Sequence, residues 1–140
     1  MKTLSRNQKA NHSIQGVVCV IDEDKRTRNG LYMVLGTLGV KVVTFSTAEG
    51  FLDRLDGDEP ALLIADLALP GMSGFELMEA LDSRGLQMPV IGLTSEMDPE
   101  KKREASRLGF LELIEKPFVY WSVVDRVQRA LCLPRGSISF

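Results

Sequence analysis

Histidine and cysteine are scarce in this sequence of 140 residues. His12 is the single histidine, and the two cysteines are Cys19 and Cys132. Two distant cysteines in apolar surroundings exclude a disulfide framework and are typical of buried thiols in a reducing compartment. Because the one histidine lies in the polar N-terminal segment, the sequence also argues against a histidine-rich zinc site and a Ser-His-Asp triad.

The sequence has neither an excess of basic residues nor an apolar run long enough for a membrane span. Its 17 Lys and Arg residues against 19 Asp and Glu residues give a net charge of -2. Nothing therefore attracts the chain as a whole to nucleic acid or to anionic lipid. Residues 1–15 lack the hydrophobic segment of a secretory signal. We expect a cytoplasmic protein that makes no direct contact with nucleic acid or membrane.

The residues that are present fit one folded domain. The chain is 44% hydrophobic and 26% charged, which is the ordinary usage of a soluble globular domain. We expect a polar tail at residues 1–15, a domain at residues 16–131, and a C-terminal tail or linker at residues 132–140. Five short apolar runs divide the expected domain, and most of them are continuous rather than alternating with polar residues. Such runs suit strands buried on both faces of a parallel sheet. They are Val17–Ile21, Val40–Phe45, Ala61–Ala65, Val90–Leu93 and Phe110–Ile114.

Helix signals lie between and after these runs: two apolar stripes, two capping boxes, and an N-cap followed by proline. In chain order they are Leu31, Val34, Leu35 and Leu38 ended by Gly39; Ser46-x-x-Glu49; Ser73-x-x-Glu76; Asp98-Pro99 with Gly109 beyond; and residues 119–131. Five such units predict an α/β fold with a doubly wound, five-stranded parallel sheet and helices on both faces. Ligands of these sheets bind at the carboxyl ends of the strands.

Four of the five expected strands deliver polar side chains to that edge. The segment Asp22-Glu23-Asp24 follows the first strand, Asp66 the third, Thr94 the fourth and Lys116 the fifth. Carboxylates crowded together need a cation, and their oxygen atoms suit Mg²⁺. A lysine and a hydroxyl beside that ion would hold phosphoryl oxygens. The pattern predicts phosphoryl transfer with a carboxylate as acceptor, while Asp24 is explained more simply as the N-cap of the first helix.

Four segments resemble the receiver domain of bacterial two-component response regulators, and most of all the nitrogen-fixation regulator subfamily, over roughly residues 16–131. Any one segment is a weak signal, but four in the family's order and spacing are specific. They are residues 20–24 (VIDED) with Arg28, residues 63–74 (LIADLALPGMSG), residues 89–94 (PVIGLT) and residues 114–118 (IEKPF). The resemblance implies a flavodoxin-like fold with strand order 2-1-3-4-5 and five helices.

The resemblance also implies a role for each residue of the site. Asp66 would accept a phosphoryl group from a sensor histidine kinase or a phosphotransfer protein. Asp22, Glu23, Asp66 and the backbone carbonyl of Ala68 would hold Mg²⁺. Thr94 and Lys116 would contact the phosphoryl group, and the bond between Lys116 and Pro117 would be cis, as is common in the family.

A receiver of this kind is a signalling switch rather than an enzyme, because it catalyses only its own phosphorylation and dephosphorylation. Phosphorylation would switch the face formed by the fourth helix, the fifth strand and the fifth helix. No DNA-binding helices follow Leu131, so we expect output through a downstream protein target or a separate output domain. A phosphorylation-dependent homodimer stays open.

The sequence departs from the family at two positions and leaves two alternative functions. Glu23 stands where the family most often has Asp, and Leu113 stands where it usually has the aromatic residue coupled to the switch hydroxyl. Both departures would suit a receiver-like interaction module that no longer depends on phosphorylation. A haloacid-dehalogenase-type phosphatase, with Asp22 as nucleophile and Asp24 as acid and base, is a remote alternative, because no later acidic pair completes its magnesium site.

Overall fold

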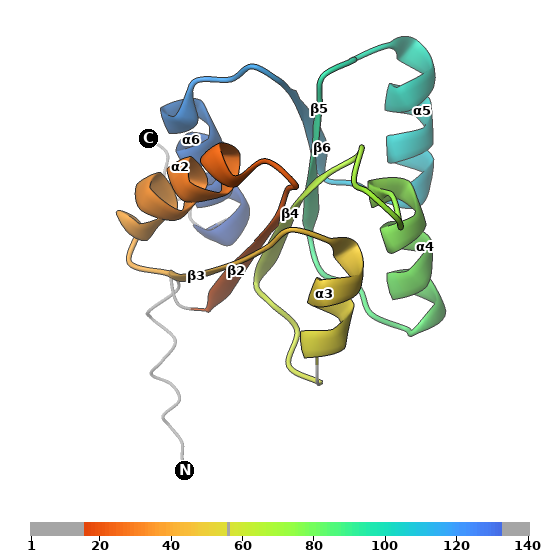
Figure 1. The fold of residues 1–140 in the computed structure, drawn as a ribbon, viewed down its shortest axis with the longest axis horizontal. Helices are drawn as coiled ribbons and strands as arrows, with labels where there is room; N and C mark the ends of the chain where they lie inside the picture. The colour runs from red at the N-terminus through yellow and green to blue at the C-terminus, as the bar shows by residue number, and fades with distance from the viewer. Residues whose placement is uncertain (1–15, 56, 133–140) are drawn as a thin grey trace.

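The five apolar runs form one parallel sheet in the computed structural model, which describes residues 16–55 and 57–132. The strands are β2 (Val17–Ile21), β3 (Lys41–Phe45), β4 (Leu62–Asp66), β5 (Val90–Thr94) and β6 (Glu112–Glu115). They lie in the order β3-β2-β4-β5-β6, and each neighbouring pair is parallel (Figure 1). This order is the predicted 2-1-3-4-5 arrangement, so the doubly wound fold is confirmed. The predicted tails, with His12, lie outside the described residues, and so does the side chain of Cys132.

The helices cover the sheet in two layers (Figure 1). They are α2 (Lys25–Gly36), α3 (Ala48–Arg54), α4 (Gly74–Ser83), α5 (Pro99–Leu108) and α6 (Tyr120–Cys132). On one face, Val18 and Val20 of β2 belong to the same core as Leu31 of α2 and Val123 of α6. On the other face, Ile21 packs in the core that α3, α4 and α5 cover. Because alternate residues of a strand point to opposite faces, this double coverage explains why the apolar runs are continuous.

Cys19 belongs to the second core, where it is 7% exposed. Burial raises the pKa of its thiol to about 11, with a smaller opposing effect from the nearby Arg54. The thiol therefore stays protonated at neutral pH and acts as a small apolar side chain. The prediction of a buried thiol is confirmed for this cysteine.

Side-chain caps begin four of the helices, and three of these caps are at the predicted residues. Asp24 accepts from the backbone N–H of Arg26, and Asp98 accepts from that of Lys101. Ser73 and Glu76 form the predicted capping box at the start of α4. Gly109 ends α5 in the left-handed conformation, with φ of 92°. These local signals fix where the helices start, and thus where the strand ends lie relative to them.

The capping box predicted at Ser46 and Glu49 is wrong. The N-cap of α3 is Thr47, whose hydroxyl accepts from the backbone N–H of Gly50 at 3.0 Å. A neighbouring hydroxyl residue can supply the same cap, so the helix begins one residue later than the Ser46 pattern implies. Glu49 is thereby freed from the box and bonds elsewhere.

A close contact between α2 and α6 explains a glycine inside a helix. A Cβ atom on Gly30 would lie 2.6 Å from the ring of Tyr120, at the start of α6. Gly30 thus makes room for the aromatic ring, at a cost in helix propensity of about 1 kcal/mol relative to alanine. The helix itself ends at Gly36, earlier than the stripe running to Gly39 suggested.

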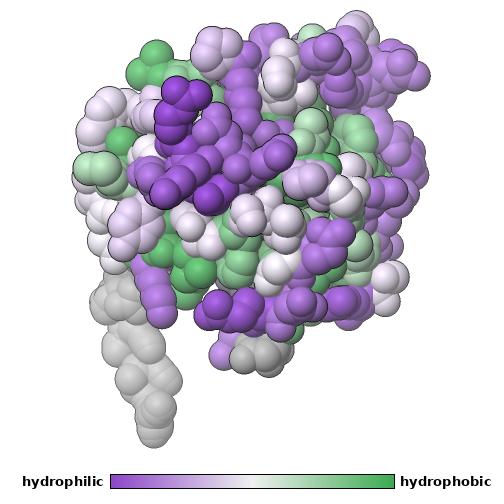
Figure 2. Space-filling view, viewed as in Figure 1, coloured by the Kyte–Doolittle hydropathy of each residue, from purple (hydrophilic) through white to green (hydrophobic). Residues whose placement is uncertain are grey.

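Part of the hydrophilic surface lies beside the carboxyl edge of the sheet. Figure 2 shows hydrophilic residues gathered over the start of α2, where the exposed residues 23–26 are all charged.

Within residues 16–55 and 57–132, no helix combines the length and the hydropathy that crossing a membrane requires.

Candidate functional site

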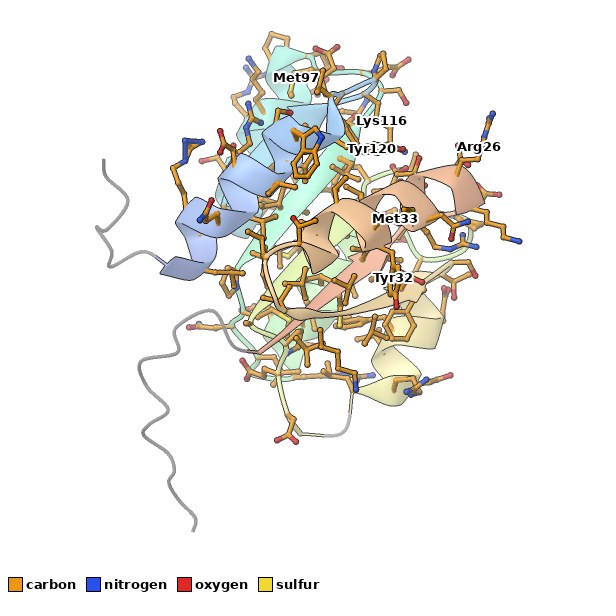
Figure 3. The ribbon with its side chains drawn as sticks, turned by 90° about the vertical axis from the view of Figure 1, so that its left-hand side faces the viewer. Arg26, Tyr32, Met33, Met97, Lys116 and Tyr120 are labelled. Carbon is orange, nitrogen blue, oxygen red and sulfur yellow. The ribbon has the colours of Figure 1, made fainter. Side chains whose placement is uncertain are left out.

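The carboxyl edge of the sheet brings together three of the predicted site residues. Asp66 ends β4, the central strand, and Asp22 follows β2, which pairs with β4. Lys116 follows β6 at the same edge, in the segment that leads to α6 (Figure 3). Its ammonium Nζ lies 2.8 Å from Oδ2 of Asp22 and 2.6 Å from Oδ2 of Asp66. One cation therefore joins two carboxylates from adjacent strands.

The remaining carboxylate oxygens bond to the backbone of their own loops. Oδ1 of Asp22 accepts from the N–H of Asp24 at 2.9 Å, and Oδ1 of Asp66 accepts from the N–H of Ala68 at 2.8 Å. Each carboxylate thus has one oxygen fixed by a local amide and one oxygen directed to Lys116. This arrangement fixes the orientation of both carboxylates.

Burial governs the electrostatics of the site. Asp22 is 1% exposed and Asp66 is 8% exposed. Burial raises the pKa of the Asp22 carboxyl group, and the hydrogen bonds from Lys116 and from the Asp24 amide oppose this only in part. Burial disfavours the charged Lys116 ammonium, but the hydrogen bonds to Asp22 and Asp66 outweigh it and raise the pKa of Lys116. The lysine therefore stays charged beside two acids.

The structure does not bring Glu23 into this group. Its side chain is exposed, and within the described part of the chain no three acidic, histidine or cysteine side chains meet closely enough to hold a metal ion. Its backbone carbonyl, however, accepts from Nη1 of Arg28 at 2.9 Å, and the same nitrogen donates to the carbonyl of Asp22 at 2.8 Å. Arg28 thus fixes the backbone of the β2–α2 loop.

Thr94 lies at the end of β5, next to both β4 and β6, and is 4% exposed. Its hydroxyl accepts from the backbone N–H of Glu96 at 3.1 Å and donates to the carbonyl of Glu96 at 3.2 Å. In this structure the hydroxyl is therefore engaged in its own loop rather than with Asp66 or Lys116. The side chain of Glu96 in turn binds Lys101 of α5, whose Nζ donates to Oε1 of Glu96 at 3.1 Å.

The remaining predicted positions lie on or beside β6. The peptide bond between Lys116 and Pro117 is cis, as the resemblance implied. Leu113, at the position that is usually aromatic in the family, pairs with Gly92 of β5. A Cβ atom on Gly92 would lie 2.6 Å from Cδ2 of Leu113. The leucine side chain thus fills the space over the glycine, on the face of the sheet that α3, α4 and α5 cover.

Sequence reasoning missed the role of Glu49 near this site. Its Oε2 accepts from the backbone N–H of Met72, in the loop that follows Asp66, at 2.9 Å. The local pattern had assigned Glu49 to a capping box, and no local signal points to a partner 23 residues away. The need for glycine at position 71, beside this carboxylate, could have drawn attention to the loop.

Comparison with known proteins assigns the family. Residues 18–128 match the family model of the response regulator receiver domain. The chain belongs to this family. The predicted family is thereby confirmed, and matches to two FixJ proteins confirm the predicted similarity to nitrogen-fixation regulators. Receiver domains are signalling domains rather than classical enzymes, and they generally bind Mg²⁺ at the phosphorylation site.

Relatives and solved structures agree with this assignment. The receiver is 34% identical to the transcriptional regulatory protein FixJ of Azorhizobium caulinodans over 114 residues, covering 81% of this chain and 54% of FixJ. It is 30% identical to TdiR of Thauera aromatica, covering 84% of this chain and 52% of TdiR. The chain thus spans about half the length of these curated relatives. The chemotaxis response regulator CheY4 of Vibrio cholerae superimposes with a TM-score of 0.75 at 28% identity, covering 84% of this chain and 99% of that one.

Proposed function

We propose that Asp66 accepts a phosphoryl group from a sensor histidine kinase or a phosphotransfer protein. The observation that supports this most is the shared contact of Lys116 with Asp22 and Asp66 at the carboxyl edge of the sheet. Asp66 is the member of this group that ends the central strand, and the resemblance of residues 63–74 to the family gives it the acceptor role. Asp66 is 8% exposed, so it is buried but not completely closed off from solvent.

The chemistry follows from the groups present. A carboxylate oxygen of Asp66 attacks the phosphorus atom of the donor phosphohistidine, and the P–N bond breaks with its electron pair remaining on the imidazole nitrogen. The product is an aspartyl phosphate. Lys116 neutralises the charge that gathers on the transferred oxygens, because its raised pKa keeps it protonated. Later attack by water on this phosphorus atom breaks the P–O bond to Asp66, which releases inorganic phosphate and restores the carboxylate. These two reactions on its own side chain are the only catalysis we assign to the chain.

The donor set fits a divalent cation. Asp22 and Asp66 are two buried carboxylates that already share one positive group, and their hard oxygen atoms suit Mg²⁺. We propose that these two side chains hold the ion, with the carbonyl of Ala68 as a further ligand. Exposed Glu23 would contribute through water. The bound ion would supply positive charge that offsets repulsion between the phosphoryl group and the acids.

We propose that phosphorylation acts on the face formed by α5, β6 and α6. Thr94 would leave its bonds with Glu96 to contact the phosphoryl group, and the contact between Glu96 and Lys101 would carry the change to α5.

Histidine kinases and output domains are the partners of receiver domains in response regulators. We expect the exchange with the kinase in the cytoplasm, and output through a separate domain or protein target. A phosphorylation-dependent homodimer is one form that this output could take.

The experiment that tests the proposal is stoichiometric labelling. The purified chain is incubated with acetyl phosphate and Mg²⁺ and weighed intact by mass spectrometry. One phosphoryl group should be added to the wild type and to the surface control Asp53→Asn, and none to Asp66→Asn. Labelling that persists in Asp66→Asn would overturn the assignment. An unlabelled wild type would favour the phosphorylation-independent interaction module, and turnover of a phosphomonoester would favour the phosphatase alternative.

A further inference from the structure

Glu49 connects α3 to the loop that follows Asp66. It lies in the first turn of α3, and its Oε2 accepts the 2.9 Å hydrogen bond from the N–H of Met72. Met72 belongs to the β4–α4 loop, residues 67–73, which lies between Asp66 and the start of α4. This hydrogen bond therefore ties the β4–α4 loop at Met72 to the neighbouring helix α3.

Gly71 shapes the loop to receive this carboxylate. Its φ of +71° lies in the left-handed region that favours glycine. A Cβ atom at this position would lie 2.7 Å from Oε2 of Glu49. The backbone conformation and the space for the carboxylate thus require glycine at the same residue.

The inner end of the loop contacts the proposed phosphoacceptor. The N–H of Ala68 donates to Oδ1 of Asp66, and the N–H of Gly74 donates to the carbonyl of Leu67 at 3.0 Å. A Cβ atom on Gly74 would lie 2.8 Å from the carbonyl oxygen of Asp66, so the loop closes tightly on the end of β4. Movement of the loop at Met72 would consequently reach the amide that orients the Asp66 carboxylate.

From this geometry we infer that Glu49 is a positioning residue for phosphoryl transfer to Asp66. Its carboxylate holds the β4–α4 loop so that the Ala68 amide stays on the Asp66 carboxylate. Glu49 touches neither the reacting atoms nor the carboxylates that Lys116 joins, and it acts through the loop. The kinetic part of this inference rests on the proposed function.

A purely structural role makes a different prediction. Glu49 lies near the N-terminus of α3, where a negative charge stabilises a helix through its dipole. Glu49→Ala and Glu49→Gln remove that charge equally. Only Glu49→Ala also removes the oxygen that accepts from Met72, because the glutamine amide oxygen can accept the same bond. The glutamine variant therefore separates positioning of the loop from stabilisation of the helix.

The test compares the rate at which acetyl phosphate and Mg²⁺ label Asp66. Glu49→Ala should slow labelling by about three- to tenfold, the range that one lost hydrogen bond commonly produces. Glu49→Gln should slow labelling clearly less than Glu49→Ala does, since an uncharged acceptor keeps a weaker form of the same bond. Asp53→Ala, which removes an exposed charge from the same helix, is the matched control and should match the wild type. Equal slowing in the Ala and Gln variants, or no slowing in either, would overturn the inference.

A second measurement does not depend on phosphorylation. Amide hydrogen exchange at Met72 and Ala68 should be faster in Glu49→Ala than in Glu49→Gln and the wild type, without any phosphodonor. Unchanged exchange at both amides in Glu49→Ala would overturn the inference even if Asp66 is labelled normally. Failure of wild-type labelling, by contrast, would reject the proposed function and leave the exchange result to decide on the loop.

Gly71 provides an internal check on the same contact. Gly71→Ala should slow labelling in the wild-type background, because the new methyl group displaces the Glu49 carboxylate and strains the backbone. In the Glu49→Ala background the clash is absent, so the same substitution should slow labelling less. Equal slowing in both backgrounds would show that Gly71 and Glu49 act independently and would contradict the inference.

Discussion

The ammonium of Lys116 lies 2.6 Å from Oδ2 of Asp66, although the two residues are 50 positions apart in the chain. The same ammonium bonds to Asp22, which is 1% exposed. The lysine thereby shares one positive charge between two carboxylates that the fold itself removes from water. The proposed chemistry uses the same cation, so its removal should affect both stability and phosphoryl transfer.

The first prediction concerns the loss of this cation. Lys116→Met should lower the free energy of unfolding by about 1 to 3 kcal/mol in the absence of Mg²⁺, because two buried carboxylates lose their shared partner. Thermal and urea unfolding measure the change, with Lys102→Met, an exposed lysine of α5, as the control. Mg²⁺ should then stabilise the Met variant more than the wild type. If Lys116→Met is as stable as the control, the ion pairs contribute nothing to the fold.

The second prediction is a pH dependence at Asp22. Because the pKa of this carboxyl group is raised in the folded protein, the folded state holds the proton more tightly than the unfolded state. The wild type should therefore lose stability as pH rises from about 4, the unfolded value, through the raised folded pKa. Asp22→Asn cannot ionise and avoids this loss.

The melting temperature of Asp22→Asn minus that of the wild type should therefore increase between pH 4 and pH 7. A change of 1 kcal/mol corresponds to about 3 to 5 °C for a domain of this size. Asp53→Asn, at an exposed position on α3, should show no such trend. A difference that stays flat or falls with pH would mean that burial does not dominate the electrostatics of Asp22.

The third prediction compares Asp22 with Glu23, the two adjacent acids that follow β2. Asp22 faces Asp66 across Lys116, whereas Glu23 is exposed. Asp22→Asn should weaken Mg²⁺ binding by at least about tenfold, and Glu23→Gln by less, as expected for a ligand that acts through water. Mg²⁺ at tenfold excess over its dissociation constant should stabilise the wild type by about 1.4 kcal/mol. Melting curves across a Mg²⁺ titration at constant ionic strength give both affinities. A larger loss in Glu23→Gln would make Glu23 the principal ligand.

Local signals in the sequence predicted much of the fold and of the site. Asp24, Ser73 and Asp98 act within three residues of their own positions, so spacing alone predicted their caps. Continuous apolar runs predicted strands buried on both faces, and the edge rule for parallel sheets then placed Asp22, Asp66 and Lys116 together. Each of these steps needs only a local pattern and one topological rule.

Contacts between distant segments could not be predicted in this way. Ser46 and Thr47 can both cap α3, and only the packed helix decides between them, which in turn frees Glu49 to reach Met72. The carboxylate of Glu23 does not join those of Asp22 and Asp66, because Glu23 lies one position beyond Asp22 on the loop, and its exposure is a property of the packed structure. Adjacent residues do not share a direction, so adjacency in sequence was a poor guide here.

The last prediction uses two glycines of one helix. Gly30 and Gly36 both lie in α2, and from propensity alone each would gain about 1 kcal/mol of stability on replacement by alanine. Their surroundings differ: a Cβ atom on Gly30 would lie 2.6 Å from the Tyr120 ring, whereas a Cβ atom on Gly36 would meet nothing within 4 Å. Gly36→Ala should therefore raise the free energy of unfolding by about 0.5 to 1 kcal/mol, somewhat less than the full value because it ends the helix. Gly30→Ala should lower the free energy of unfolding, since displacing the ring costs more than the propensity gain, and overpacking typically costs about 1 to 3 kcal/mol.

Urea unfolding of both variants measures the difference. Tyr120→Ala should relieve the clash, so Gly30→Ala should be stabilising in that background. If Gly30→Ala stabilises the wild-type chain as much as Gly36→Ala does, the close contact between α2 and Tyr120 does not constrain the fold.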